Sequence, residues 1–118
     1  MRDFKRYTVW EKAHRLTLAV YAATGGFPRE ELYGLKGQIR RSCTSVPANI
    51  AEGCGRDTDA DFARFLQVSA GSANELEYHL LLARDLGLLE SPKHAALDAE
   101  VNDVKRMLAT LTRKLRSN

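Results

Sequence analysis

The chain lacks several features that would assign a protein of 118 residues to a definite class. It holds only two cysteines and no Cys-x-x-Cys pair, which argues against a zinc ribbon or a dithiol redox site. No uncharged stretch reaches the roughly 20 apolar residues of a membrane-spanning helix, and residues 1–6 lead into no apolar signal segment. We therefore expect one cytoplasmic domain over residues 1–118, with a single core and no membrane contact.

The two cysteines, Cys43 and Cys54, are expected to be free thiols. On a continuous helix their separation corresponds to about 16 Å of rise, whereas a disulfide needs Cα atoms within about 7 Å of each other. With no further cysteine in the chain, we interpret both as small buried hydrophobic side chains.

Catalytic and metal-binding patterns are also scarce. A di-iron bundle uses two Glu-x-x-His pairs and two further glutamates, but only Glu11 and His14 have this spacing, because Glu75 and His79 are four apart. No nucleophile elbow or phosphate-binding glycine loop occurs, and the glycines of segment 53–55 are interpreted as a helix terminator. We expect no metal, no cofactor and no enzymatic activity.

What the sequence does contain is helical periodicity in four stretches. In the first and the last, Thr8 is placed to cap a helix that ends at Gly25, while Ser91 and Pro92 are typical of a helix start. The apolar positions of these two helices recur at intervals of three and four: Val9, Ala13, Leu16 and Val20, then Leu97, Val101, Val104, Leu108, Leu111 and Leu115.

The second helix is predicted from Leu35 to Arg56, with a proline inside it. Pro47 lacks an N–H and clashes with the preceding turn, so a kink is expected there, and nearby hydroxyls such as Ser42 and Thr44 are placed to bond the freed backbone groups. The apolar line of this helix consists of Leu35, Ile39, Cys43, Val46, Ile50 and Cys54.

The third helix opens on Thr58 and Asp61, which resemble a capping box, and is predicted to reach Leu86. Small residues at 70–73 would let another backbone come close. The positions expected to face inward are Phe62, Phe65, Leu66, Ser69, Ala73, Leu76, Leu80 and Ala83. No strand-like alternation competes with the four helices, and the connections are short. The predicted fold is an all-α, antiparallel, up-down four-helix bundle whose second helix is kinked at Pro47.

Surface composition adds two observations. Residues 80–82 are consecutive leucines, and Leu88 and Leu89 follow, so a lone bundle does not easily hide all of this apolar surface. The net charge of +3 is unevenly distributed: residues 57–90 carry a net charge of −5, whereas residues 1–24, 25–56 and 91–118 are each positive. These patterns favour a homo-oligomer with a basic surface that is repeated in every subunit.

The most informative stretch runs from Gln38 to Arg56 and reads QIRRSCTSVPANIAEGCGR. It resembles the signature of the bacterial 23S rRNA intervening-sequence proteins, also called the four-helix-bundle protein family, in which Gln-x-Arg-Arg precedes Ser-x-Pro-x-Asn-Ile-Ala-Glu-Gly. The chain is also similar to the accessory variability determinant of diversity-generating retroelements. The resemblance implies a ring-like homopentamer and partnership with RNA or with an enzyme that acts on nucleic acid.

The functional hypothesis is a protein that binds RNA, or a nucleic-acid-processing protein, through basic side chains. The alternative is a homo-oligomeric interaction scaffold without nucleic-acid binding. The candidate phosphate contacts are Arg40, Arg41, Arg56, Arg113, Lys114 and Arg116. Because neighbours on a helix point about 100° apart, at most one of Arg40 and Arg41 is expected to face a given ligand.

Gln38, Asn49 and Glu52 are polar residues of the signature, and two interpretations of Asn49 and Glu52 stay open. Asn49 and Glu52 either form an exposed cluster that binds something, or are buried and bridge to the third helix by hydrogen bonds. A buried Glu52 would require a cationic partner, because an unpaired buried carboxylate is costly.

Overall fold

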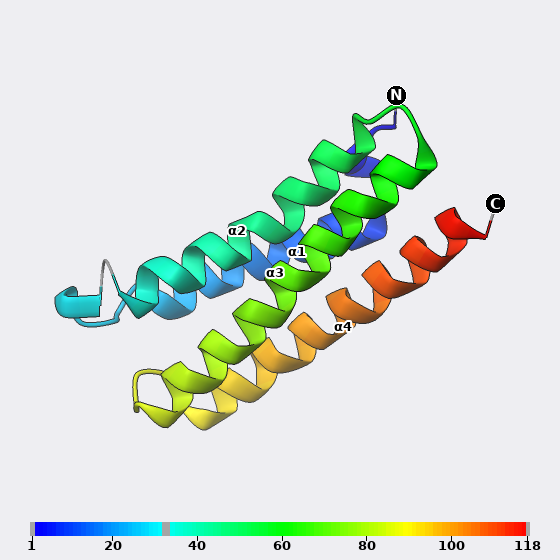
Figure 1. Ribbon diagram of the computed structural model, residues 1–118. Helices are drawn as coiled ribbons and strands as arrows, with labels where there is room; N and C mark the ends of the chain where they lie inside the picture. Colours follow the sequence, from blue (N-terminus) through cyan, green and yellow to red (C-terminus); the bar gives the residue numbers. More distant parts are fainter. Residues whose placement is uncertain (1, 32–33, 118) are drawn as a thin grey trace.

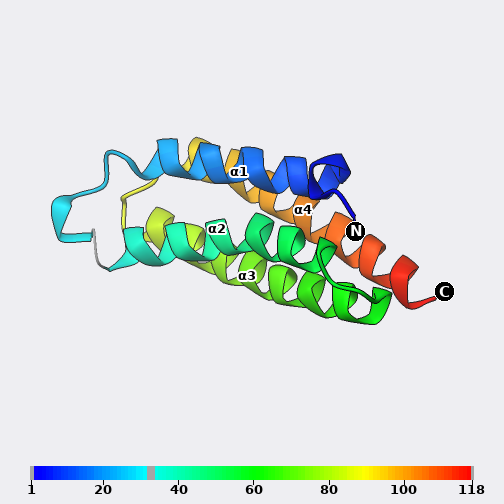
Figure 2. The same cartoon turned by 90° about the horizontal axis from the view of Figure 1, so that it is seen from above.

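The computed structural model describes residues 2–31 and 34–117, and it has four long helices in an elongated bundle of 46 × 23 × 19 Å (Figures 1 and 2). The helices are α1 (Thr8–Thr24), α2 (Leu35–Cys54), α3 (Asp59–Asp85) and α4 (Ser91–Arg116). Two short 3-10 helices, η1 (Phe4–Arg6) and η2 (Arg29–Glu31), precede α1 and α2. The described residues contain no strand, so the predicted all-α bundle is confirmed.

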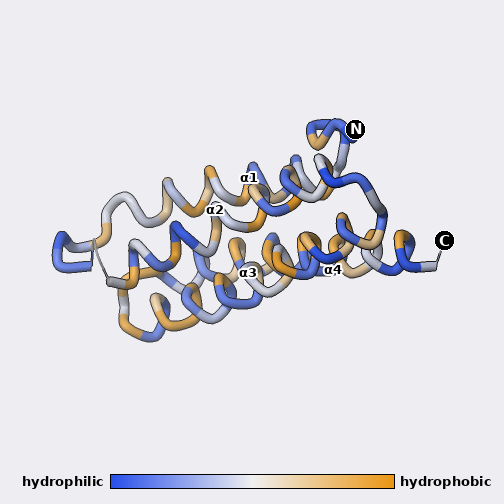
Figure 3. The backbone as a smooth tube through the Cα atoms, turned by 45° about the horizontal axis from the view of Figure 1, so that its top comes forward, coloured by the Kyte–Doolittle hydropathy of each residue, from blue (hydrophilic) through white to orange (hydrophobic). Residues whose placement is uncertain are grey.

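The helices form a ring in which each packs on two others, in the order α1, α2, α3, α4. Consecutive helices run in opposite directions, so the N-terminus, the α2–α3 turn and the end of α4 share one end of the bundle (Figure 1). Along each helix, apolar and polar positions alternate within a turn (Figure 3). The four apolar stripes meet in one core that runs the length of the bundle.

The helix starts differ in part from the expected caps. The backbone is still extended at Tyr7 and at Glu90, so Thr8 and Ser91 are the first helical residues rather than the caps. The expected cap of α3 is confirmed, because the Thr58 hydroxyl accepts a hydrogen bond from the Asp61 N–H at 3.1 Å. The α2 helix ends at Cys54, two residues before the predicted end.

Pro47 lies inside α2, and the helix runs on both sides of it. The predicted kink stays a prediction. The nearby hydroxyls act differently from what was expected: Ser42 donates to the Gln38 carbonyl and Thr44 to the Arg40 carbonyl. The Cys43 carbonyl, which loses its helical donor to the proline, is approached by the Thr17 hydroxyl of α1 at 3.5 Å.

A close approach between two helices lies at Gly53, where α2 meets α3. A Cβ atom added to Gly53 would lie 2.8 Å from Phe62 Cδ1 and 2.9 Å from Phe65 Cβ, so only glycine fits there. The small segment 70–73 was the expected place for such an approach. A Cβ on Gly71 meets nothing within 4 Å, so that expectation is wrong for this glycine.

The core matches the predicted pattern with a few exceptions. On α3, Phe65 is only half-buried, whereas Ala63 and His79 are buried. Of the consecutive leucines, Leu80 is fully buried and Leu81 remains 37% exposed. Among the described residues, the large apolar side chains that stay exposed are Leu18, Tyr21, Val68, Tyr78, Leu81 and Leu86. Within the two described segments, no helix is both long enough and apolar enough to cross a membrane.

Candidate nucleic-acid interface

Arg40 is held firmly within the fold. Its Nε donates to Thr24 Oγ1 and its Nη2 to the Tyr21 carbonyl, both at 3.0 Å, and the guanidinium lies 4.3 Å from the centre of the Tyr21 ring. These contacts place a cation at the C-terminal end of α1, where the helix dipole is negative. Its neighbour Arg41 is exposed. The expected division of roles within the arginine pair is therefore visible, and Arg41 is the one that faces solvent.

Arg56 lies in the turn between α2 and α3 and is bound by a carboxylate. Its Nε donates to Asp61 Oδ2 at 2.6 Å, while Arg64 Nε donates to Asp61 Oδ1 at 2.9 Å. Both guanidinium groups also lie over the Phe65 ring. The hydrogen bond from Arg56, followed by that from Arg64, lowers the pKa of Asp61. Asp61 thus partly neutralises the charge of Arg56.

The last turns of α4 carry Arg113, Lys114 and Arg116, which are all exposed. Within the part of the chain that the structure describes, no carboxylate lies within 4.0 Å of these three cations. Arg113 Nη2 makes only a long contact of 3.4 Å with Thr110 Oγ1. Cations are favourable at this position because the C-terminus of a helix has a partial negative charge.

A second segment brings more positive charge to the same end. Lys114 and Tyr7 line one surface groove, so the end of α4 lies beside the start of α1, which follows Lys5 and Arg6 of η1. We call these five exposed cations, Lys5, Arg6, Arg113, Lys114 and Arg116, the basic end. Figure 2 shows η1 and the end of α4 at the same end of the molecule.

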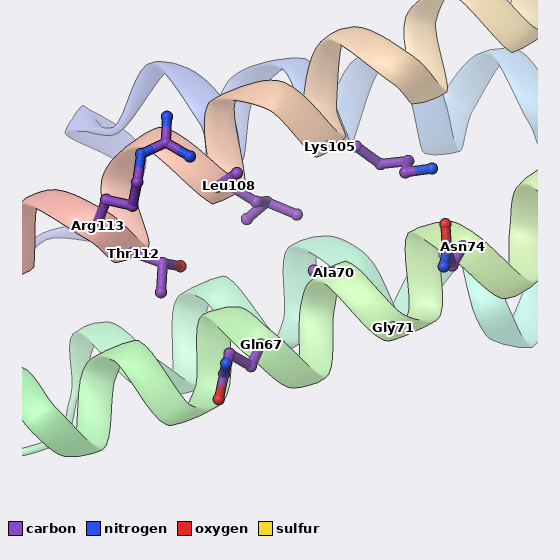
Figure 4. A pocket seen from close by; sticks show the side chains of 9 residues that line it. Gln67, Ala70, Gly71, Asn74, Lys105, Leu108, Thr112 and Arg113 are labelled. Atoms are coloured by element: carbon purple, nitrogen blue, oxygen red, sulfur yellow. The ribbon is translucent and has the colours of Figure 1, made fainter. Parts of the chain in front are cut away.

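A groove of about 470 Å³ leads from the basic end between α3 and α4 (Figure 4). Arg113, Thr112 and Gln67 lie at one end of it, and Asn74 and Lys105 at the other. No acidic residue is among its lining residues.

Lys105 is tied to the bundle at this groove, because its Nζ donates to Glu77 Oε1 at 2.7 Å. Asn102 Nδ2 also donates to Glu77, at 3.2 Å. The hydrogen bond from Lys105 is the main cause of the lowered pKa of Glu77, and the hydrogen bond from Asn102 lowers this pKa further. Arg113 is therefore the cation of this groove that has no carboxylate beside it.

Asn49 and Glu52 divide between the two interpretations. Asn49 is half-buried and donates to the Ser45 carbonyl and hydroxyl at 2.8 and 2.9 Å, and Ser45 shares a 2.8 Å hydrogen bond with Ser72 of α3. Asn49 thus supports a hydrogen-bonded bridge to α3, as the second interpretation expects. Glu52 and Gln38 are exposed, so the interpretation of Glu52 as a buried bridging residue is wrong.

The structure also locates the groups that could carry other chemistry. Cys43 and Cys54 are free and buried, as expected, and burial raises the pKa of Cys43 to about 11, which keeps it a thiol. His79 and His94 are buried on α3 and α4. Across residues 2–31 and 34–117, no cluster of three or more metal-ligating side chains occurs.

Sequence reasoning missed one feature near the basic end. The Trp10 ring stacks on the His14 ring with centroids 5.1 Å apart and planes within 5°, and Phe4 meets Trp10 edge-on at 4.9 Å. The spacing of four residues between Trp10 and His14 was visible in the sequence, since such pairs are neighbours on a helix surface. The contribution of η1 was not visible.

Comparisons with known proteins fit this architecture. A sequence profile described as 23S rRNA-intervening sequence protein matches residues 5–110, which span almost all of the four helices. The chain belongs to that family. No curated protein matches the sequence significantly.

Among solved structures, the fold is similar to a protein of unknown function from the S23 ribosomal protein family of Bacteroides thetaiotaomicron VPI-5482. The TM-score is 0.80 at 23% sequence identity, over 89% of this chain and 98% of the other. This similarity supports the four-helix architecture of the family member described here. At this level of identity it concerns the fold alone.

Proposed function

We propose that this family member is a non-enzymatic, cytoplasmic, homo-oligomeric protein that binds RNA through its basic end. The observation that carries the proposal is the contrast among the cations. Arg2, Arg15 and Arg56 each lie within 2.6 Å of a carboxylate, whereas the three cations at the end of α4 lie beside no carboxylate of residues 2–31 and 34–117. Side chains without a local counter-charge are the ones available to phosphate groups.

Assembly strengthens the proposed role. By its resemblance to ring-forming relatives, the chain is proposed to form a pentamer, which would repeat the basic end five times and multiply a net charge of +3 per chain. Each phosphate contact releases condensed counterions, so affinity rises with the number of contacts and falls with salt. The family description, which refers to an intervening sequence of 23S rRNA, also supports RNA as the partner.

The test is a titration of the purified oligomer with labelled RNA and DNA at several salt concentrations. We expect binding at low salt that weakens steeply as salt rises. Changing Arg113, Lys114 and Arg116 together to alanine should weaken binding and flatten the salt dependence. A matched control removes three cations from the opposite end of the bundle: Arg29, Arg84 and Lys93. If the control weakens binding as much as the test variant, or if RNA does not bind at all, the proposal is wrong.

The second candidate function is an interaction scaffold without nucleic acid. It is favoured by the exposed apolar side chains of α3, since Val68, Tyr78 and Leu86 are each more than 45% exposed. Large apolar side chains on one helix are typical of a surface that another protein subunit covers. Light scattering tests the assembly that both candidates share: a stable species of 13.2 kDa at micromolar concentration would contradict it.

A further inference from the structure

A column of aromatic rings begins at the basic end and continues along α1. Phe4 of η1 contacts Trp10 edge-on, and Trp10 stacks in parallel on His14. Phe4 and Trp10 are half-buried and His14 is exposed, so the last ring of the stack presents its free surface to solvent. A parallel aromatic stack that ends at solvent offers the geometry on which a nucleobase can stack.

The same stripe of α1 carries further apolar side chains in the direction away from the basic end. Leu18 and Tyr21 are 58% and 41% exposed, and they lie one and two turns beyond His14. From Trp10 to Tyr21 the helix rises about 16 Å, which is long enough for several bases. The Arg40 guanidinium lies 4.3 Å from the centre of the Tyr21 ring and keeps that ring in place. The Tyr21 hydroxyl lies 3.5 Å from Thr44 Oγ1.

The charges beside this stripe favour an anionic ligand. Lys5 Nζ lies 5.8 Å from the centre of the Phe4 ring, and Arg6 follows it in the basic end. Two carboxylates close to the stripe in sequence are already engaged, because Glu11 accepts a hydrogen bond from Arg15 at 2.6 Å and Asp3 caps η1 through the Lys5 N–H at 3.1 Å. Aromatic rings interleaved with cations that lack carboxylate partners are typical of surfaces that bind single strands.

We propose that the exposed face of α1 formed by Trp10, His14, Leu18 and Tyr21 is a stacking platform for the bases of single-stranded RNA. This inference rests on the proposed function, because the phosphates of the same strand contact the basic end. The protein therefore selects unpaired RNA. In a duplex the bases are stacked on one another and paired, so their faces are not available to His14 and Tyr21.

The chain contains its own reporter for this contact, because Trp10 is its only tryptophan. The experiment titrates the purified full-length protein with a labelled RNA of roughly 12 nucleotides and with the matching duplex. Binding is followed by anisotropy of the label and, separately, by Trp10 emission. We expect the single strand to bind about tenfold more tightly than the duplex and to change Trp10 emission, since each stacked base adds about a tenfold factor or more.

Two variants remove parts of the platform and keep Trp10. Because His14 stacks on Trp10, their RNA binding is compared by the anisotropy of the label. His14→Ala deletes an exposed ring, and Tyr21→Leu replaces the second ring with an apolar side chain. Each is expected to weaken single-strand binding about tenfold while duplex binding and its salt dependence stay unchanged. The matched control is Tyr78→Ala, which deletes an aromatic side chain of α3 that is 58% exposed and lies outside the stripe. It should leave the ratio of the single-strand and duplex affinities unchanged, and light scattering shows whether the oligomer is kept.

The outcomes separate this inference from the proposed function. If both RNA forms bind equally and only the basic-end variant weakens them, the basic-end proposal stands and the stacking platform is wrong. The platform is also overturned if His14→Ala or Tyr21→Leu dissociates the oligomer in light scattering, because this face would then be a subunit contact. If neither RNA form binds at low salt, the proposed function itself fails.

Discussion

The α2–α3 and α1–α4 contacts of the same bundle are built in different ways. Between α2 and α3 the backbones approach so closely that a Cβ on Gly53 would clash with two phenylalanines, and buried Ser69 donates to the Val46 carbonyl at 2.8 Å. Between α1 and α4 lies a groove of about 660 Å³, lined by alanines, leucines and charged side chains. The ion pair between these helices, Lys12 with Asp103, is 3.6 Å long and exposed.

The difference shows how a small bundle can combine rigidity with an adaptable surface. Around Gly53 and Ser69 the α2–α3 contact leaves no room for an added group, so a change of one methyl group there should alter stability strongly. The exposed side chains that line the α1–α4 groove have open space beside them, so changes to them should alter stability little. The predictions below test this contrast by measuring unfolding free energies on both sides of the molecule.

The largest effect is expected for Gly53→Ala. The added methyl would lie 2.9 Å from Phe65 Cβ, an atom that cannot rotate away, so overpacking should destabilise the protein by about 1 to 3 kcal/mol and lower Tm by roughly 4 °C per kcal/mol. The control is Gly71→Ala on α3, where the new Cβ meets nothing within 4 Å. The higher helix propensity of alanine should raise the free energy of unfolding by about 0.5 to 1 kcal/mol. Equal effects of the two substitutions in thermal unfolding would contradict the close approach.

The next effect concerns the buried hydroxyl at the same contact. Ser69→Ala removes the donor to the Val46 carbonyl and should reduce the free energy of unfolding by about 1 kcal/mol. Ser72→Ala is the comparison, because its hydrogen bond to Ser45 is half-exposed and should matter less. Urea denaturation of both variants measures the difference. A neutral Ser69→Ala would show that packing alone holds α2 against α3.

A smaller effect is expected at α3–α4, and it depends on pH. Hydrogen bonds from Lys105 and Asn102 lower the pKa of Glu77, so its contribution to stability is present above the ordinary value of 4.5 and is lost as the pH falls through the lowered pKa. Glu77→Gln should cost about 0.5 kcal/mol at neutral pH and little in acid. The free energies of unfolding of the parent protein and of Glu77→Gln, measured from neutral pH to roughly pH 3, show whether the destabilisation depends on pH.

The smallest effect is expected at α1–α4. Lys12→Ala removes an ion pair whose side chains are 41% and 37% exposed, so stability should change by less than about 0.5 kcal/mol. The change should vanish at high salt, because exposed pairs are screened. A loss as large as that of Gly53→Ala, measured by the same thermal unfolding, would remove the contrast between the two sides.

The helices themselves could be predicted because their signals are local. The spacing of Leu97, Val101, Val104 and Leu108 marks one face of α4, and all four are buried. Phe65 shows where this reasoning ends, since it lies in register with the core but is only half-buried: its Cβ lies against α2 at Gly53, and two arginine side chains lie over its ring. Periodicity identifies a face but not the group that covers it.

The candidate site was less predictable because it depends on how chain ends meet. The sequence shows that Arg40 and Arg41 point apart, yet only the position of the α1 C-terminus beside α2 decides that Arg40 is the one engaged. Likewise, nothing in the sequence places Tyr7 beside Lys114, more than 100 residues away along the chain. Whether the six candidate cations bind phosphate stays a prediction.

Pro47 gives α2 a property that the other three helices do not share. It has no amide hydrogen, and the carbonyl it leaves free, on Cys43, is approached from α1 by Thr17. Before this gap the helix is fastened to α1 through Arg40, and after it the helix is packed on α3 through Gly53. The amide protons of residues 36–43 should therefore exchange with solvent when α1 opens, and those of residues 48–54 when α3 opens. Hydrogen exchange along this single helix would then report the opening free energies of both halves of the bundle.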